Sequence, residues 1–218
     1  MSGFFNPDNF LWRFFGKAFD IFGASCMWLL CSMPLITVGT ASIALYDTVA
    51  HCLRGSETNL AKRFFGTFKK ELIPGILLTI LWAAIAMFFW FSYQIIYQMA
   101  QADAALSIFA VVYYFTLAIP VGILGWAIAV ESRFVYRFFQ LHKMALYFCF
   151  AHLPTTIIMV LLALAAIEIC VDFPFMALFV PGIIVYFQSF FMEKVFKKYM
   201  PAEEPEQIEA AEEEPAEA

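Results

Sequence analysis

Residues 72–102 read LIPGILLTILWAAIAMFFWFSYQIIYQMAQA, a run that contains no Asp, Glu, Lys or Arg. A helix that crosses the hydrocarbon core of a bilayer, roughly 30 Å thick, needs about 20 predominantly apolar residues. Backbone groups inside lipid must form their hydrogen bonds within their own segment, so such a run indicates a helix. Charge-free runs also cover residues 104–130, 144–167 and 173–192. We therefore predict membrane helices at about residues 74–98, 105–130, 145–168 and 173–193.

The composition of the whole chain agrees with this assignment. Of its 218 residues, 63% are hydrophobic and 14% are charged, whereas soluble domains average about 45–50% apolar and about 25% charged residues. The mean hydropathy is +0.78. A water-soluble domain of this size could not bury so much apolar surface. The composition therefore excludes an ordinary soluble enzyme or a secreted domain.

The acidic character of the chain comes from its last residues. Eight of the 18 acidic residues follow Met200, in a segment made largely of Glu, Ala and Pro. Residues 1–200 carry the 13 basic residues and the other 10 acidic residues, a net charge of +3. A charged segment of low hydrophobicity cannot form a core. We therefore predict a single membrane domain over residues 1–200 and a disordered acidic tail over residues 201–218.

The first apolar block, residues 21–46, is interrupted by Pro34 and Gly39. Proline removes a helical hydrogen bond, and glycine adopts backbone conformations that other residues avoid. Two structures fit this block. It forms either one long kinked helix or a hairpin of two short helices, at about residues 18–33 and 40–53. The hairpin would either cross the membrane twice or re-enter it from the same side.

The basic residues favour the hairpin. Lys and Arg in short loops mark the cytoplasmic side of a membrane protein. All 13 fall into four clusters, around residues 13–17, 54–70, 133–143 and 194–198. With the hairpin, every basic residue and both termini lie in the cytoplasm. The predicted fold is therefore an all-α, polytopic transmembrane helix bundle with five to six spans in the cell membrane.

Two further segments have the pattern of helices that lie in the membrane surface. Residues 4–19 combine many aromatic residues with Arg13 and Lys17, which is typical of an N-terminal interfacial helix among the lipid headgroups. The loop over residues 55–71 has a similar amphipathic pattern, formed by Lys62, Phe64, Phe65, Phe68, Lys69 and Leu72. This loop either lies along the membrane or docks a cytoplasmic partner.

Few ionisable residues lie inside the predicted helices, and such residues are functional candidates because they are costly in lipid. Asp47 and His51 are four residues apart and share a helix face, while His152 lies just ahead of Pro154. These three residues could line the path of a proton or cation. In the simpler alternative, Asp47 and His51 form an ion-paired cluster with Arg54, and His152 bonds to a neighbouring helix.

Signals of catalysis and of cofactor binding are missing from the sequence. It has no Gly-x-Ser-x-Gly, His-Glu-x-x-His or P-loop motif, and its five cysteines form no Cys-x-x-Cys pair. We therefore predict no catalytic residue, no cofactor, no metal site and no nucleic-acid partner. Glu131 and Arg133, at the inner end of a predicted helix, are expected to pair with each other.

The broken first block also resembles a known family. Its Pro-x-x-Thr-x-Gly turn, ahead of Ala-Leu-Tyr, resembles the signature of the YesL-like family of bacterial integral membrane proteins. The residues concerned are Pro34, Thr37, Gly39, Ala44, Leu45 and Tyr46. Shorter matches follow at residues 64–69, 132–134, 152–156 and 196–199, so the resemblance covers about residues 5–199.

The resemblance implies a function without a defined chemistry. Members of the family have no established activity, and they look like accessory proteins of carbohydrate uptake systems, beside ABC-type importers and sensor kinases. We therefore expect a non-enzymatic accessory or regulatory protein in the lipid bilayer, with an importer or sensor kinase subunit as partner. A small transporter or channel with a path near Asp47, His51 and His152 is the alternative, and a homo-oligomer fits either function.

Overall fold

The computed structural model describes residues 10–54, 59–102, 107–134 and 136–199, and every regular element in these residues is a helix. The α-helices are α1 (Phe10–Ser32), α2 (Val38–Thr48), α3 (Leu60–Lys70), α4 (Leu72–Ala102), α5 (Ser107–Arg133), α6 (Phe138–Ala151), α7 (Leu153–Asp172) and α8 (Val180–Phe196). Two 3-10 helices, η1 (Leu35–Thr37) and η4 (Pro174–Leu178), and a π-helical turn, η2 (Val49–Leu53), complete the order. The all-α prediction is confirmed for these residues, and the predicted acidic tail lies outside them.

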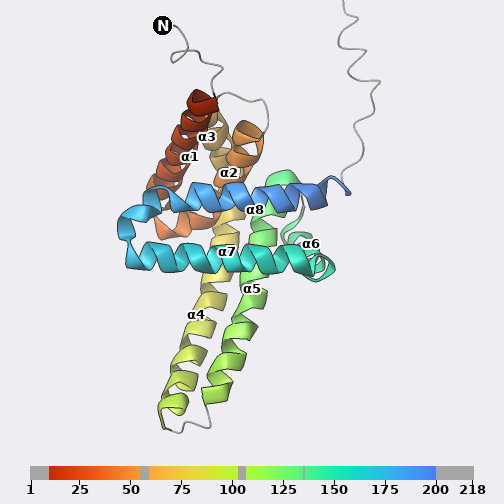
Figure 1. Ribbon diagram of the computed structural model, residues 1–218. Coiled ribbons are helices and arrows are strands. Elements are labelled where there is room, and N and C mark those ends of the chain that lie inside the picture. The colour runs from red at the N-terminus through yellow and green to blue at the C-terminus, as the bar shows by residue number, and fades with distance from the viewer. Residues whose placement is uncertain (1–9, 55–58, 103–106, 135, 200–218) are drawn as a thin grey trace, which may run out of the picture.

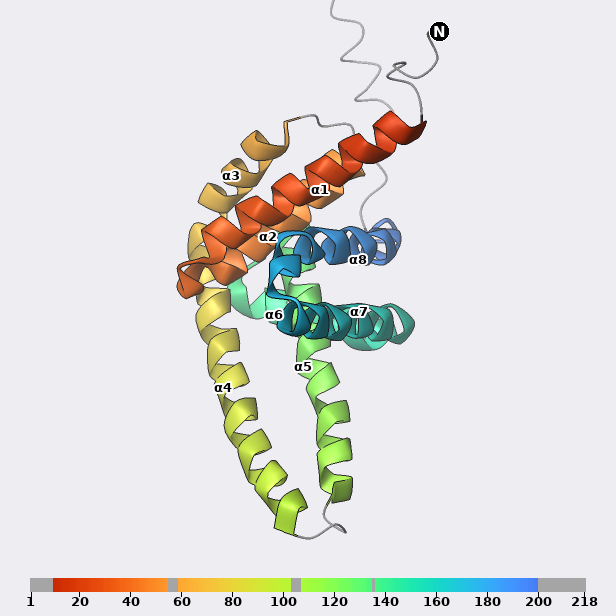
Figure 2. The same ribbon diagram turned by 60° about the vertical axis from the view of Figure 1, so that its left-hand side comes forward.

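The two longest helices, α4 and α5, form a hairpin, and α1, α2 and α3 gather around the end at which α4 begins (Figure 1). A second hairpin, α7 and α8, runs across the first one in both views (Figures 1 and 2). The far half of the first hairpin extends away from the other helices. We call residues 83–102 and 107–121 the outer arm, and the remaining helices the body.

Four of the described helical segments are long and apolar enough to cross a membrane. They are Leu35–Leu53, Leu72–Gln101, Phe115–Arg133 and Leu153–Asp172. Buried apolar side chains fill the body, with Trp126, Phe148 and Phe196 in contact at its centre. The structure is thus that of a helical membrane protein, with a packed body and a hairpin that leaves it.

The first apolar block is a hairpin and not one kinked helix. Pro34, in an extended conformation, ends α1, and the chain turns so that α2 returns along α1. The Thr37 hydroxyl donates to the Cys31 carbonyl at 2.6 Å and so satisfies a backbone group at the end of α1. Across the hairpin, Trp28 Nε1 donates to Ser42 Oγ at 3.1 Å. The break predicted at Pro34 is therefore confirmed.

The N-terminal prediction needs a correction, because α1 is continuous from Phe10 to Ser32. The described part of the predicted interfacial helix, residues 10–19, and the predicted helix at 18–33 are one element. Its two glycines, Gly16 and Gly23, face open space and do not interrupt it. Residues 4–9 of the predicted interfacial helix lie outside the described residues.

The glycine of the turn motif allows α2 and α4 to approach closely. The Gly39 amide donates to Thr79 Oγ1 at 2.9 Å, and a Cβ on Gly39 would lie 2.6 Å from the Gly75 carbonyl oxygen. Real Cβ atoms do not approach that closely, so glycine is required here. The remaining motif residues Ala44, Leu45 and Tyr46 are buried. The motif is therefore a structural one, which ends α1 and seats α2 against α4.

The predicted helix over residues 145–168 is wrong, because the chain breaks there at His152. Helix α6 ends at Ala151, and α7 begins at Leu153 with Pro154 in its first turn. Proline lacks the amide that would continue α6. The Thr156 hydroxyl lies 2.9 Å from the Cys149 carbonyl and covers the backbone group that the break leaves open. The predicted helix at 173–193 likewise starts later, at Val180, after η4.

Candidate functional site

The most polar region of the body surrounds Asp47, near the end of α2. This carboxylate is only 2% exposed, yet both of its oxygens have partners. Arg63 of α3 approaches with Nε at 2.6 Å from Oδ2 and Nη2 at 2.9 Å from Oδ1. Thr67 donates its hydroxyl to Oδ2 at 2.6 Å. A two-pronged guanidinium–carboxylate contact is strong and directional, so it fixes α3 against α2.

His51 connects this pair to a second one. Its Nδ1 lies 2.9 Å from Asp47 Oδ1, and its Nε2 lies 2.9 Å from Nη1 of Arg133, on α5. Nη2 of Arg63 also lies 3.1 Å from His51 Nδ1 and 3.2 Å from His51 Nε2, so the imidazole lies between the two guanidinium groups. His51 lies in the π-helical turn η2, a rare geometry that is often found at functional sites.

The second pair joins α5 to α8. Arg133 Nε and Nη2 both lie 2.9 Å from Glu193 Oε1, and the two side chains are 15% and 13% exposed. Tyr46 donates its hydroxyl to the same oxygen at 3.2 Å. We call the set of Tyr46, Asp47, His51, Arg63, Thr67, Arg133 and Glu193 the charge cluster. It links α2, α3, α5 and α8.

The groups of the charge cluster bond to one another. Two carboxylates face two guanidinium groups, and the His51 imidazole lies between the guanidinium groups. Loss of one partner from a buried ion pair typically destabilises a protein by about 3–5 kcal/mol, because the remaining charge is left uncompensated. Among the described residues no group of three or more His, Cys, Asp and Glu side chains could hold a metal ion. The geometry of the charge cluster is that of a structural contact that holds helices together.

Two expected contacts differ from the structure. Arg54 does not join Asp47, because its guanidinium donates to the Ser189 carbonyl and lies 5.4 Å from the Phe190 ring centre, on α8. Arg133 pairs with Glu193 and not with Glu131. One carboxylate oxygen of Glu131 is buried without a hydrogen-bond partner in the part of the chain that the structure describes.

Sequence reasoning missed Arg63 and Glu193 as partners of the predicted residues. Each lies far along the chain from at least one group it contacts, so spacing on a single helix does not reveal the pair. A weak signal existed for Glu193, which is the one acidic residue between Phe173 and Tyr199. A lone carboxylate in an apolar run requires a partner.

His152 is not part of the charge cluster. It lies at the corner between α6 and α7, with Nε2 3.2 Å from the Tyr199 hydroxyl and its ring near Phe148 and Trp126. Burial and, to a smaller extent, the positive charge of Lys198 lower the pKa of His152 below its ordinary value. The structure thus brings Asp47 and His51 together and leaves His152 with other partners.

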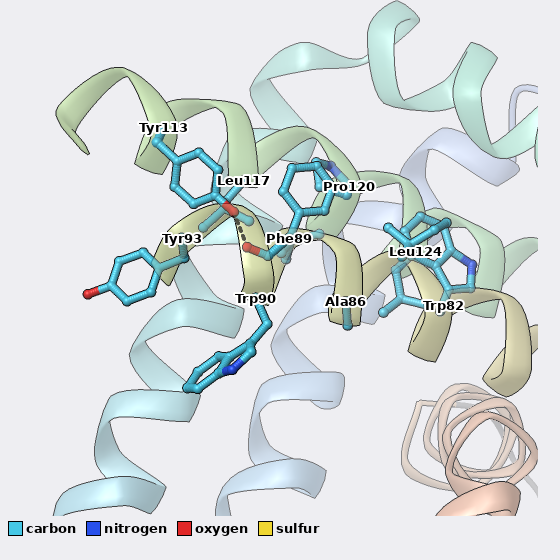
Figure 3. Close-up of a pocket in the computed structure, with 11 residues that line it drawn as sticks. Trp82, Ala86, Phe89, Trp90, Tyr93, Tyr113, Leu117, Pro120 and Leu124 are labelled. Carbon is cyan, nitrogen blue, oxygen red and sulfur yellow. Dashed lines mark hydrogen bonds between the residues drawn. The ribbon is translucent and has the colours of Figure 1, made fainter. Parts of the chain in front are cut away.

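The outer arm holds a cavity of a different kind, which we call the arm cavity. It measures about 390 Å³ between α4 and α5, and aromatic side chains form much of its wall (Figure 3). Tyr113 points across it, with its hydroxyl on the backbone oxygen of Phe89. Trp82 and Tyr93 of α4 also line it, and Trp90 lies at its edge and points away from Phe89 (Figure 3). No charged residue lines this cavity.

Comparison with known proteins supports part of the resemblance seen in the sequence. Residues 9–93 match a family model described as "Protein of unknown function, DUF624". The YesL-like proteins belong to that family. No curated protein and no solved structure matches the chain. The matched region contains the turn motif and five of the seven members of the charge cluster, whereas Arg133 and Glu193 lie outside it.

Proposed function

We propose that the protein is a non-enzymatic accessory or regulatory subunit of a carbohydrate uptake system, bound to an ABC-type importer or its sensor kinase. The observation that carries the proposal is the fixed orientation of α3. Arg63 and Thr67 bind Asp47 on its inner side, and Phe64 is fully buried beside them. The opposite side leaves Lys62, Phe65 and Lys69 exposed.

This outer surface of α3 suits a protein partner. Phe65 is 45% exposed, between two lysines, and an aromatic anchor within a charged rim is typical of protein interfaces. Because the charge cluster already holds the helix in place, binding does not have to order it, which lowers the entropic cost of association. Arg63 and Thr67, on the inner side of α3, are bound to Asp47, so their role is to position the helix.

The contacts of the N-terminal hairpin support a re-entrant topology. Gly39, in the first turn of α2 and next to the turn of the hairpin, touches α4 at Gly75 and Thr79, within the first two turns of a helix that continues to Ala102. At 1.5 Å per residue, the hairpin reaches only about 10 Å beyond the start of α4. We therefore place both termini and the basic loops in the cytoplasm, with α4 and α5 crossing the bilayer.

Cysteine labelling in intact cells tests this topology. In a variant without its native cysteines, Gln101→Cys at the far end of α4 is expected to react with a membrane-impermeant maleimide from outside the cell. Leu35→Cys, in the exposed turn of the hairpin, is expected to remain unlabelled until the membrane is opened. Labelling of Leu35→Cys from outside would show a hairpin that crosses the bilayer fully.

Affinity purification of the full chain from its native membrane tests the function. We expect the membrane subunit of an ABC importer or a sensor kinase to co-purify in mild detergent, and Phe65→Ser to remove it. Phe139→Ser is the matched control, because it changes the last residue of a second Arg-Phe-Phe sequence, is 81% exposed and lies on α6. Recovery of the chain alone, or equal recovery of the partner with both variants, contradicts the proposal.

A small transporter or channel is the second candidate, favoured by the burial of Asp47 and its contact with the half-buried His51 within a candidate span. In that case Asp47→Asn abolishes flux through reconstituted vesicles while the protein remains inserted. The internal pairing of the charge cluster is why the accessory function ranks first, since a transport path needs groups that exchange their partners. Unchanged flux in Asp47→Asn vesicles removes this candidate.

A further inference from the structure

The body contains a second cavity, larger than the arm cavity. It measures about 610 Å³ and lies between α1, α2, α5, α7 and α8. Small side chains on its wall, among them Gly125, Ala163 and Ala166, leave the space open. Sites for small ligands typically measure about 300–1,000 Å³ and are mostly apolar with a few polar groups. We call this space the inner cavity.

Most polar groups that line the inner cavity are already bonded. Ser42 Oγ accepts from Trp28 Nε1 and donates to a backbone carbonyl. Tyr46 donates to Glu193. Gln188 of α8 is different, because its Nε2 donates to the Met159 carbonyl at 3.1 Å and its own side-chain carbonyl accepts no hydrogen bond from any described residue. Gln188 is partly exposed and lines the cavity, so its amide oxygen is available to a donor that enters the space.

We propose that the inner cavity binds an uncharged amphiphile, whose hydroxyl donates to the Gln188 carbonyl and whose apolar chain fills the space beside Ala163 and Ala166. A donor is required because the open group of Gln188 is an acceptor. A charged headgroup is excluded, because no Asp, Glu, Lys, Arg or His lines the cavity to balance it. This inference does not depend on the accessory function proposed above.

The arm cavity does not meet the same conditions. The Tyr113 hydroxyl is bonded to the Phe89 backbone within the hairpin (Figure 3). Trp82 Nε1, which is buried without a partner among the described residues, is a donor and not an acceptor. The inner cavity combines shape with an open acceptor, and this makes a prediction about ligand chemistry possible.

Photo-crosslinking tests the proposal on the full chain in phosphatidylcholine nanodiscs. The probe is hexadecanol with a diazirine in mid-chain, and the comparison probe is the matching hexadecane without the hydroxyl. We expect saturable labelling of cavity-lining peptides, competed by unlabelled hexadecanol. The alkane probe should label these peptides about fivefold less, as the loss of one hydrogen bond would cause.

Two variants test the position of the site. Ala163→Phe fills the cavity and should reduce labelling at least tenfold, whereas Ala83→Phe, exposed on α4, should leave it unchanged.

A second variant separates ligand loss from misfolding. Gln188→Leu keeps the size of the side chain and removes the acceptor, so it should weaken labelling by the alcohol to the level of the alkane while the alkane signal persists. Labelling that does not saturate, or that is equal in Ala163→Phe and the parent chain, overturns the site. Alcohol labelling in Gln188→Leu at the parent level overturns the assignment of the hydroxyl.

Discussion

The body and the outer arm differ in what surrounds their helices, which is protein in the body and lipid in the outer arm. In the candidate span Leu35–Leu53, 56% of the most apolar window is buried inside the chain, whereas in Leu72–Gln101 the value is 11%. The first helix is positioned by named contacts, with Asp47 bound to Arg63 and Gly39 close to Gly75. The second is specified mainly by composition, because bilayer lipid receives the surface that the protein leaves exposed.

This comparison teaches where substitutions matter. In the body, the central residues make specific contacts, and no neighbouring side chain can take over a contact that a substitution removes. Substitutions there should therefore lower the free energy of unfolding strongly and in a residue-specific way. In the outer arm, exposed apolar residues such as Phe88 and Phe91 can be replaced by other apolar residues with little change in stability. The following predictions test that contrast, from the largest effect to the smallest.

The largest loss of stability is expected for Arg63→Met. This change leaves the Asp47 carboxylate, 2% exposed, without its guanidinium, and should lower the free energy of unfolding by about 3–5 kcal/mol. The double variant with Asp47→Asn should regain part of that loss, because no buried charge remains.

The control for this prediction is Lys62→Met, at a neighbouring exposed position, which should change stability by no more than about 0.5 kcal/mol. Denaturant unfolding in detergent micelles measures all of these values, and equal values for Arg63→Met and Lys62→Met would contradict the role of the charge cluster.

The next effect concerns the contact between α2 and α4. A Cβ in Gly39→Ala would meet the Gly75 carbonyl at 2.6 Å, and overpacking of this kind typically destabilises by about 1–3 kcal/mol. In Gly23→Ala the new Cβ meets nothing within 4 Å, so the higher helix propensity of alanine should stabilise α1 by up to about 1 kcal/mol. Melting temperatures of the two variants should therefore move in opposite directions. If both rise, the close approach of the two helices is incorrect.

A smaller effect compares two threonines directly. Thr156 in the body accepts from Trp126 Nε1 at 3.0 Å and covers the Cys149 carbonyl, so Thr156→Val should cost about 1–3 kcal/mol through the unpaired groups that remain. Thr116 on the outer arm is exposed, and its hydroxyl bonds only within its own helix, to Val112. Thr116→Val should therefore be nearly neutral in micelles and in bilayers. Similar losses for both variants would remove the distinction between the two regions.

The same contrast explains what the sequence could predict. Helices of the outer arm follow from charge-free runs, and the break at Pro34 follows from the covalent geometry of proline, so both are local properties. The pairs of Asp47 with Arg63 and of Arg133 with Glu193 depend on how distant segments fold back. The corner at His152 was missed for a related reason. An apolar run has the same composition whether it is one helix or two, although Pro154 marked the position at which a break is possible.

The smallest effect concerns that corner and its dependence on pH. Burial and the charge of Lys198 disfavour the protonated form of His152, so its pKa in the folded chain lies below the ordinary value of 6.5. The unfolded chain then binds more protons between the two pKa values, and unfolding becomes easier as the pH falls from 7 through 6.5.

The variant His152→Gln should remove this part of the pH dependence, because glutamine does not titrate but still reaches Tyr199. The quantity to measure is the difference in melting temperature between pH 7.5 and 5.5, compared between the parent chain and the variant. A larger drop in the variant than in the parent would mean that His152 is stabilised as a cation at this corner.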